Sequence, residues 1–101
     1  MKLTESLIES ILASLGREAG KETNSNVSVL VEVDGDEFRC LYLINRGDTY
    51  AVVKSWGKVD LFKSPQLLRQ YKEELLQQVK KELEQREAVA SFSATAMLCL
   101  N

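Results

Sequence analysis

Apolar and polar residues alternate along the middle of the chain, from residue 27 to residue 53. Valine occupies every second position from Val27 to Val33, and a second alternating run contains Phe38, Cys40, Tyr42 and Ile44. Such alternation is typical of strands that bury one face, because successive side chains point to opposite sides. The sequence Asp34-Gly35-Asp36 between the two runs is typical of a tight turn, so the pattern predicts a β-hairpin.

The position of the turn sets which residues of this hairpin share a face. A two-residue type I′ turn at Asp34 and Gly35 would place Val31 opposite Phe38. One face is then apolar and contains Val27, Val29, Val31, Val33, Phe38, Cys40 and Tyr42. The other face is mixed and contains Ser28, Leu30, Glu32, Glu37, Arg39 and Leu41, with Glu32 opposite Glu37. A slip of one residue would move every valine to the other face, so we expect a firm register.

The N-terminal segment predicts an amphipathic helix over residues 4–16. Thr4 is a suitable N-cap, and the apolar residues after it have helical spacing. They are Leu7, Ile8, Ile11, Leu12 and Leu15. Gly16 or Gly20 is expected to end the helix, because glycine favours the left-handed conformation found at helix C-termini. Residues 17–26 are polar without a period, which predicts a mobile loop.

Two further strands are predicted after the hairpin. Residues 45–48 are typical of a turn, with a loop of three or four residues and Gly47 at positive φ. The third strand covers Thr49 to Trp56, with one side formed by Tyr50, Val52, Lys54 and Trp56. A turn at Gly57 and Lys58 leads into a short fourth strand from Val59 to Phe62. Sequential strands with short connections predict an antiparallel meander.

A second amphipathic helix is predicted from Ser64 and Pro65 to residue 86 or so. Ser64 is a suitable N-cap, and Pro65 fits the first helical position, where its missing N–H needs no partner. Residues 88–101 carry no charge and alternate in polarity, which predicts a fifth strand over residues 92–99. Continued helix is the alternative, because alanine is common in this segment and favours helix over strand.

The 101 residues have a length suited to one α+β domain, which we expect to span residues 1–101. The net charge of −2 argues against an extended nucleic-acid or anionic-membrane surface, although a local basic patch remains compatible with it. Two cysteines, Cys40 and Cys99, are too few for a disulfide framework, and the N-terminus turns acidic at Glu5, unlike a secretory signal. We therefore expect a cytoplasmic protein with reduced thiols.

The residue types offer little for catalysis. The sequence contains no histidine, which removes the commonest general base and the imidazole metal ligand. Asp34, Asp36 and Glu37 form a small acidic cluster, but the regularly spaced oxygen ligands of a calcium-binding loop are missing. The cysteines do not have zinc-site spacing. We expect no enzymatic activity, no metal and no cofactor.

The side chains best suited to bind a partner lie on the predicted sheet. Aromatic and cationic residues interleaved on a sheet are enriched in protein interfaces, and they also stack nucleic-acid bases and neutralise phosphates. The candidate partner-binding set is Trp56, Tyr50, Arg39, Lys54, Leu41 and Leu43. The favoured interpretation of Tyr50 and Trp56, however, is a position beneath a helix, which would make them core residues. A nucleic-acid site would use Arg39, Lys54, Trp56 and Lys58.

The second face of the sheet is predicted to be apolar as well. The residues assigned to it are Leu30, Leu41, Leu43, Ala51 and Val53. An apolar face needs a cover, so either each face has its own helix or both helices lie on one face and leave the other to a partner. The sequence thus predicts a small protein-interaction or regulatory adaptor module, and our hypothesis is a homodimer through the spare face. The alternative is a nucleic-acid-associated accessory protein.

Overall fold

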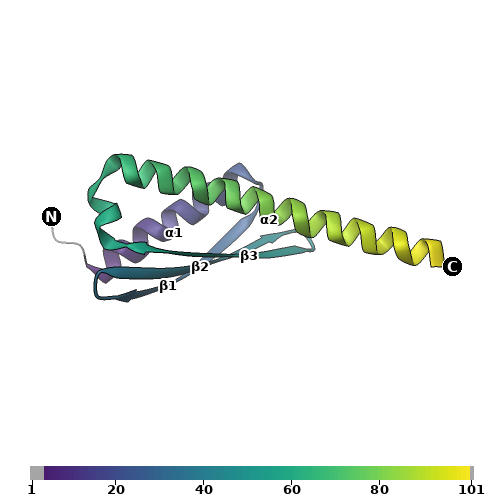
Figure 1. The fold of residues 1–101 in the computed structure, drawn as a ribbon, viewed down its shortest axis with the longest axis horizontal. Coiled ribbons are helices and arrows are strands. Elements are labelled where there is room, and N and C mark those ends of the chain that lie inside the picture. The colour runs from purple at the N-terminus through teal and green to yellow at the C-terminus, as the bar shows by residue number, and fades with distance from the viewer. Residues whose placement is uncertain (1–3, 101) are drawn as a thin grey trace.

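The computed structural model describes the backbone of residues 4–100 and the side chains of residues 4–87. Its elements are, in order, α1 (Glu5–Glu22), β1 (Asn26–Asp34), β2 (Glu37–Arg46), β3 (Thr49–Lys58), the 3₁₀-helix η1 (Val59–Lys63) and α2 (Pro65–Leu100). The strands form one antiparallel sheet in the order β1-β2-β3. Both helices lie on the same side of this sheet (Figure 1). The predicted α+β class, with one helix before and one after an antiparallel sheet, is confirmed.

The first hairpin turns one residue later than predicted. Its two loop residues are Gly35 and Asp36, because Asp34 already pairs with Glu37. Gly35 has a φ of +64°, whereas Asp36 is not among the residues with positive φ. These signs are those of a type II′ turn, which takes glycine at its first central position, and the type I′ prediction is wrong.

The later turn shifts the register of the hairpin by two residues. Phe38 therefore pairs with Val33 and not, as predicted, with Val31. An even shift leaves every side chain of the hairpin on its predicted face. The shift also pairs Glu32 with Arg39, which replaces the expected repulsion between two glutamates by an attraction of opposite charges.

The second hairpin decides which side chains of β3 face the helices. Its loop, Gly47–Asp48, has two residues instead of the predicted three or four, and its glycine has the predicted positive φ, at +61°. This register pairs Leu43 with Val52 and turns Ala51 and Val53 into the core. The prediction that Ala51 and Val53 share a face with Leu43 is therefore wrong. That grouping requires a loop with an odd number of residues, which reverses the faces of the strand.

Helix α1 is longer than predicted and includes residues 17–22, which the sequence had predicted as loop. The Thr4 side chain caps its N-terminus, since Oγ1 accepts a hydrogen bond from the Leu7 backbone N–H at 3.1 Å. The predicted apolar stripe packs on the sheet, with Ile8, Leu12 and Leu15 buried. The stripe continues beyond residue 16 with residues so small that their apolar character gives no clear helical period.

The C-terminus of α1 is formed by asparagine and not by glycine. Asn24 has a φ of +55°, and the backbone N–H of Ser25 donates to the carbonyl of Gly20 at 2.7 Å, as in a Schellman motif. Gly16 and Gly20 lie inside the helix, so the prediction that one of them ends it is wrong. They permit close packing instead, because a Cβ added at Gly16 would lie 2.7 Å from Cγ2 of Val29.

The predicted fourth strand, from Val59 to Phe62, is wrong, because residues 59–63 form η1. The backbone N–H of Val59 donates to the carbonyl of Asp36 at 2.7 Å, beyond the last residue of β3. The chain then crosses to the helical layer, where the Phe62 ring packs against Phe38 with 5.2 Å between ring centroids. A crossing segment with alternating apolar residues resembles a strand in sequence, and only its tertiary contacts distinguish the two.

Helix α2 begins as predicted but continues further. Pro65 is its first residue, and Oγ of Ser64 accepts a hydrogen bond from the Leu67 backbone N–H at 3.3 Å. The helical backbone extends to Leu100. The strand predicted over residues 92–99 is therefore not seen in the described backbone, which follows the alternative of a continued helix. The high helix propensity of alanine in this segment accounts for the difference.

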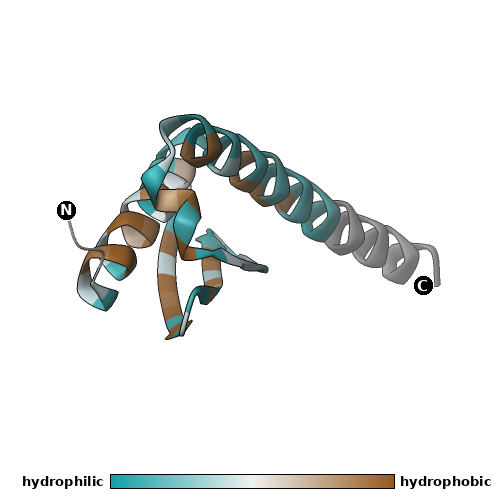
Figure 2. Ribbon diagram, turned by 60° about the vertical axis from the view of Figure 1, so that its left-hand side comes forward, coloured by the Kyte–Doolittle hydropathy of each residue, from teal (hydrophilic) through white to brown (hydrophobic). Residues whose placement is uncertain are grey.

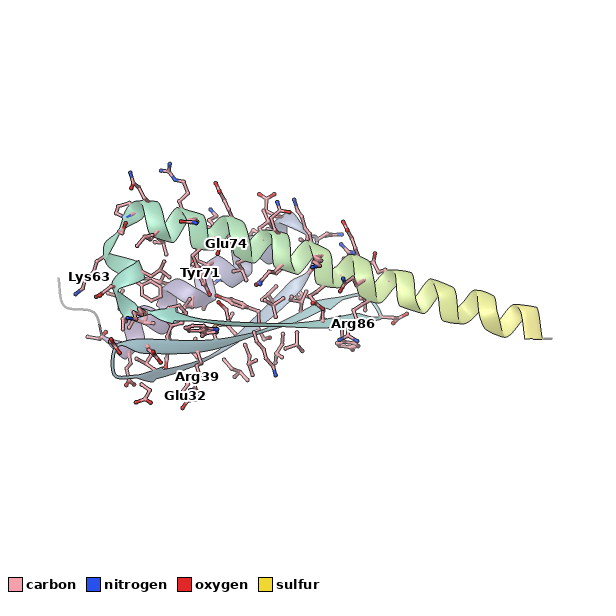
Figure 3. The ribbon with its side chains drawn as sticks, viewed as in Figure 1. Glu32, Arg39, Lys63, Tyr71, Glu74 and Arg86 are labelled. Carbon is pink, nitrogen blue, oxygen red and sulfur yellow. The ribbon has the colours of Figure 1, made fainter. Side chains whose placement is uncertain are left out.

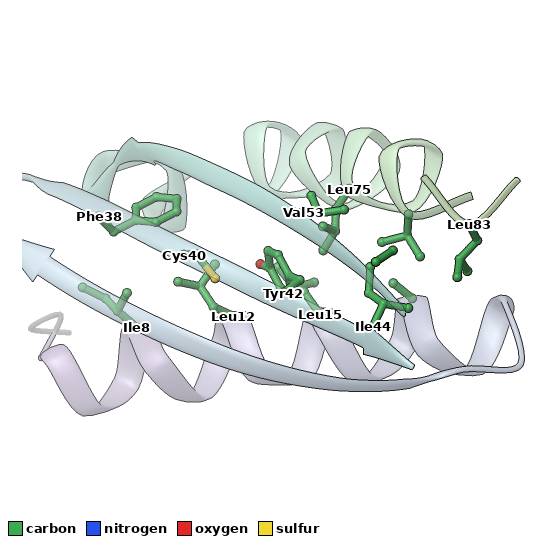
Figure 4. Close-up of a cluster of buried hydrophobic side chains, with 13 residues drawn as sticks. Ile8, Leu12, Leu15, Phe38, Cys40, Tyr42, Ile44, Val53, Leu75 and Leu83 are labelled. Atoms are coloured by element: carbon green, nitrogen blue, oxygen red, sulfur yellow. The ribbon is translucent and has the colours of Figure 1, made fainter. Parts of the chain in front are cut away.

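The hydrophobic core lies between the two helices and one face of the sheet, here called the inner face (Figure 4). Its buried residues are Ile8, Leu12, Leu15, Ala19, Phe38, Cys40, Tyr42, Ile44, Ala51, Val53, Leu75, Val79 and Leu83. The central strand β2 supplies its largest side chains, and its burial alternates from residue to residue. In Figure 2, hydrophobic residues are prominent on α1 and the strands, while much of the described part of α2 is hydrophilic.

Polar contacts near the β2–β3 turn connect the sheet to both helices. Nε of Arg46 donates to the Glu87 carboxylate at 2.9 Å, and Nη1 of Arg46 donates to the carbonyl of Thr23 at 3.1 Å. A further ion pair joins the helices, with Lys72 Nζ 2.6 Å from a carboxylate oxygen of Glu18. These contacts fix both helices against the inner face and leave the opposite face of the sheet free of them.

Candidate functional site

The face of the sheet that points away from both helices, here called the outer face, is uncovered by any part of the chain whose side chains are described. It consists of the even-numbered residues of β1 and β3 and the odd-numbered residues of β2. Strand pairing arranges them in rows across the sheet, and one row contains Glu32, Arg39 and Trp56. Figure 3 shows Glu32 and Arg39 projecting from the sheet on the side opposite the helices.

The structure brings the whole predicted partner-binding set together on the outer face. Its members are Trp56, Tyr50, Arg39, Lys54, Leu41 and Leu43. Trp56 is 75% exposed and Tyr50 is 69% exposed, so the interpretation that a helix covers them is wrong. Leu43 is also exposed, while Leu41 is half-buried in the middle of the face. The face therefore presents aromatic, aliphatic and cationic groups side by side.

Two apolar residues of the outer face were missing from the predicted set. Leu30 is 58% exposed and pairs with Leu41, and Val52 is 45% exposed and pairs with Leu43. A signal for their placement is present in the sequence, since both hairpin loops consist of the dipeptide Gly-Asp. Two equal two-residue loops fix the register of all three strands and place Leu30 and Val52 on the same face.

A hollow of about 480 Å³ lies on the outer face. Its lining includes the outer-face residues Leu30, Leu41, Glu32, Arg39, Lys54 and Trp56. Its size is within the range of small-molecule and side-chain pockets, and leucines beside charged groups suit a ligand with an apolar centre and a polar margin. The arrangement can bind an apolar or aromatic side chain.

The charges of the outer face are segregated between its edges. Glu32 and Asp34 lie on β1, whereas Lys54 and Lys58 lie on β3. The central strand contributes one charge of each sign, Glu37 and Arg39, so three acidic and three basic groups cancel. Within the described side chains none of these groups forms an ion pair. All of them are therefore available to a partner.

The titratable groups of the inner face are buried between the layers. The Tyr71 hydroxyl, on the side of α2 that faces the sheet (Figure 3), is hydrogen-bonded to the Tyr42 hydroxyl at 2.9 Å and to Oγ of Ser55 at 2.8 Å. Burial raises the pKa of both tyrosines, and the proximity of the two hydroxyls adds to the increase at Tyr42. Both side chains stay protonated at neutral pH and serve to join α2 to the sheet.

Cys40 lies among these groups, and its side chain is 3% exposed. Burial raises its thiol pKa from 9.0 to about 11. The unfolded chain then ionises this thiol above pH 9 while the folded chain keeps it protonated, so the folded state loses stability as the pH rises between 9 and about 11. In a Cys99→Ser background, we expect this thiol to lower the free energy of unfolding by up to about 1.4 kcal/mol per pH unit.

Urea denaturation followed by circular dichroism at a series of pH values measures this effect. The matched variant Cys40→Ala, in the same Cys99→Ser background, is expected to show a shallower decline over the same range. Equal declines in the two proteins would contradict a buried, protonated thiol.

The described side chains contain no group of three or more cysteine, aspartate or glutamate residues placed to hold a metal ion. Among the described helices, none combines the length and the apolar character needed to cross a bilayer.

Comparison with known proteins gives no match. No protein-family model, curated protein or solved structure matches the chain. The function is therefore inferred from the outer face alone.

Proposed function

We propose that this chain is a small, non-enzymatic protein-interaction module of the cytoplasm, and that its outer face binds another polypeptide. The observation that carries the proposal is the group of exposed apolar side chains on one continuous surface. They are Leu30, Leu43, Tyr50, Val52 and Trp56. Exposed apolar groups gathered on one face, with polar groups at the margin, are characteristic of interaction sites. A cytoplasmic location is consistent with the free thiol of Cys40.

The physical argument is the burial of these side chains by the partner. Transfer of a large apolar side chain from water to a packed interface stabilises the complex by roughly 1.5–3 kcal/mol. Trp56 is the most exposed of them, and tryptophan, tyrosine and arginine are the residues most enriched among interface hot spots. We therefore expect Trp56, with its row neighbour Arg39, to contribute most to the affinity.

A nucleic-acid-associated role is the second candidate, because Arg39 pairs directly with Trp56 and Lys54 lies in the next row. This cluster has the aromatic and cationic groups that single strands bind. The acidic edge, with Glu32 beside Arg39, weighs against it, since phosphates are repelled there and the face has no net positive charge. A protein partner, which has charges of both signs, fits the face better.

Site-specific photo-crosslinking in cells tests the proposal. A photoreactive amino acid at Val52, on the outer face, is expected to give polypeptide adducts, while the same group at Gln77, exposed on α2, gives none. The change Trp56→Ala in the Val52 crosslinker should reduce the adducts at least about tenfold, the factor for losing a contact of roughly 1.4 kcal/mol. Equal adducts at Val52 and Gln77, or adducts that Trp56→Ala does not reduce, would refute a binding role for this face.

An oligonucleotide-binding measurement on the purified protein distinguishes the nucleic-acid role from the protein-binding role. We expect no binding to a fluorescent single-stranded oligonucleotide at physiological salt, in either the parent or the Trp56→Ala variant. Binding that weakens as salt is added, and that is lost in Trp56→Ala, would favour the nucleic-acid role over the protein-binding role.

A further inference from the structure

The outer face is complementary to itself in charge. Its β1 edge carries Glu32 and Asp34, and its β3 edge carries Lys54 and Lys58. These two pairs lie at the same end of the sheet, because Asp34 and Lys58 belong to one row across the strands. A surface with opposite charges on opposite edges attracts a copy of itself that is turned over, and a two-fold symmetric interface requires this kind of self-match.

One symmetry operation brings the opposite edges together. A half-turn about an axis that is parallel to β2 and lies between two facing sheets places β1 of one copy over β3 of the other. Each row of residues across the sheet then faces the same row of the second copy. Asp34 then faces Lys58 of the second copy, and Glu32 lies between Lys54 and Lys58 of the second copy. The same charge pairs are repeated on the other side of the axis.

The axis passes over the central strand β2, whose outer-face residues include the apolar pair Leu41 and Leu43 and the charged pair Glu37 and Arg39. Leu41 and Leu43 would meet the same residues of the second copy, so the middle of the contact is apolar and its margins are charged. Glu37 and Arg39 also lie close to the axis and meet the same residues of the second copy. Each has a direct cross-strand neighbour of opposite charge in its own chain, Lys58 for Glu37 and Glu32 for Arg39, so these charges are balanced locally. Two facing sheets of this type pack in an aligned manner, about 10 Å apart.

The size of the face meets the requirement of a specific dimer. Strands of this length at about 3.3 Å per residue, with three strands at about 4.8 Å spacing, give a projected area of roughly 500 Å² per copy. The two copies together thus bury roughly 1,000 Å², which is the lower limit for a specific interface and corresponds to a modest affinity. The buried accessible area is larger than this projected area, because the side chains make the surface uneven.

We propose that the polypeptide bound by the outer face is a second copy of this chain, in a sheet-to-sheet dimer with its two-fold axis parallel to β2. This inference rests on the proposed function and names the partner of the same surface. The complex has four layers, with the two sheets inside and the helices of each copy outside. Trp56 and Leu30, which are 75% and 58% exposed in the isolated chain, become buried in it.

Charge reversal tests both the partner and the axis. We expect the wild-type protein to sediment as a dimer at micromolar concentrations and low salt. The variant Glu32→Lys/Asp34→Lys has basic groups on both edges, and Lys54→Glu/Lys58→Glu has acidic groups on both edges. Each should form homodimers at least about tenfold more weakly than wild type, because like charges then face each other.

The mixture of the two variants provides the decisive measurement. In an equimolar mixture, every basic edge of one variant faces an acidic edge of the other, so we expect heterodimers in native mass spectrometry with an affinity near that of wild type. The exposed α2 variant Glu73→Lys/Glu84→Lys changes the net charge as much as Glu32→Lys/Asp34→Lys does, and it should dimerise like wild type. Circular dichroism of each variant confirms that the fold is retained.

Two outcomes overturn the inference in different ways. A wild-type chain that stays monomeric at all these concentrations excludes the second copy, and Val52 crosslinks to a polypeptide of other mass would then leave the proposed function intact. Dimers that form equally well in all variants, without preference for the mixed pair, exclude the axis parallel to β2. The absence of any Val52 crosslink together with a monomer would refute both proposals.

Discussion

Replacement of Phe38 by alanine is expected to lower the free energy of unfolding by about 3–5 kcal/mol, the range for removal of a fully buried aromatic ring. The ring is 0% exposed, and its centroid lies 5.2 Å from that of Phe62 and 6.0 Å from that of Tyr71. Gly57, opposite Phe38 on β3, leaves space for the ring, since a Cβ there would lie 3.1 Å from it. The ring is surrounded by β3, η1 and α2. We expect these three elements to keep the cavity left by the Phe38→Ala change from collapsing.

This loss is a large part of the total for a chain of this size, because native domains are stable by only about 5–15 kcal/mol. Urea denaturation followed by circular dichroism measures it. Trp56→Ala, compared at a protein concentration low enough to keep the chain monomeric, is the matched control, since this larger ring is 75% exposed and its removal should change stability by no more than about 0.5 kcal/mol. Similar losses for the two variants would contradict the assignment of Phe38 to the inner face and Trp56 to the outer face.

Replacement of Gly20 by alanine is expected to destabilise the protein by about 1–2 kcal/mol, although alanine is the better helix former by about 1 kcal/mol. A Cβ at this position would lie 2.7 Å from the carbonyl oxygen of Ser25 and 3.1 Å from Cγ2 of Val27. The first of these atoms belongs to the backbone, in the segment that closes the Schellman motif around Asn24. The C-terminus of α1 must therefore move away from β1 to admit the methyl group.

Thermal and urea denaturation of Gly20→Ala measure the net effect of clash and propensity. Ser14→Ala is the control, because Ser14 is exposed on α1 and its replacement should be neutral or slightly stabilising. If Gly20→Ala were as stable as Ser14→Ala, α1 would not approach the sheet as closely as the structure describes.

The sequence contains enough information for the fold class and for the faces of the first hairpin. Valine occupies every second position from Val27 to Val33, and an error of two residues in the turn leaves the faces of these side chains unchanged. Helix α2 was equally clear at its start, where Ser64 and Pro65 form a standard N-terminus. These features depend on local chemistry, which the amino-acid sequence states directly.

The candidate site depended on a single loop length. All six predicted binding residues lie on the outer face, but Ala51 and Val53 were also assigned to it, as a second loop of three residues would require and loops of two or four residues would not. One residue more or less in a hairpin loop exchanges the two faces of the following strand. Whether Tyr50 and Trp56 were core or surface could not be decided from their own residue types, because both environments favour large aromatic rings.

The remaining errors concern segments whose conformation is set by tertiary contacts. Gly16 and Gly20 are read as helix ends in isolation, but here they allow α1 to lie close to Val27 and Val29. The apolar residues from Val59 to Phe62 fit a strand, but they pack across the end of the core in η1. In both segments the decisive factor is a neighbour distant in sequence, which a local period does not contain.

A sheet covered on one side only divides each of its strands into two sets of residues under separate constraints. In β2, Phe38 and Tyr42 hold the layers together, whereas Arg39 and Leu43, adjacent in sequence, make no contribution to that core. Exchange of every second residue would therefore give the surface a new binding preference while the interior stays as it is. The strands act as a platform whose specificity can diverge between duplicated copies without loss of the scaffold.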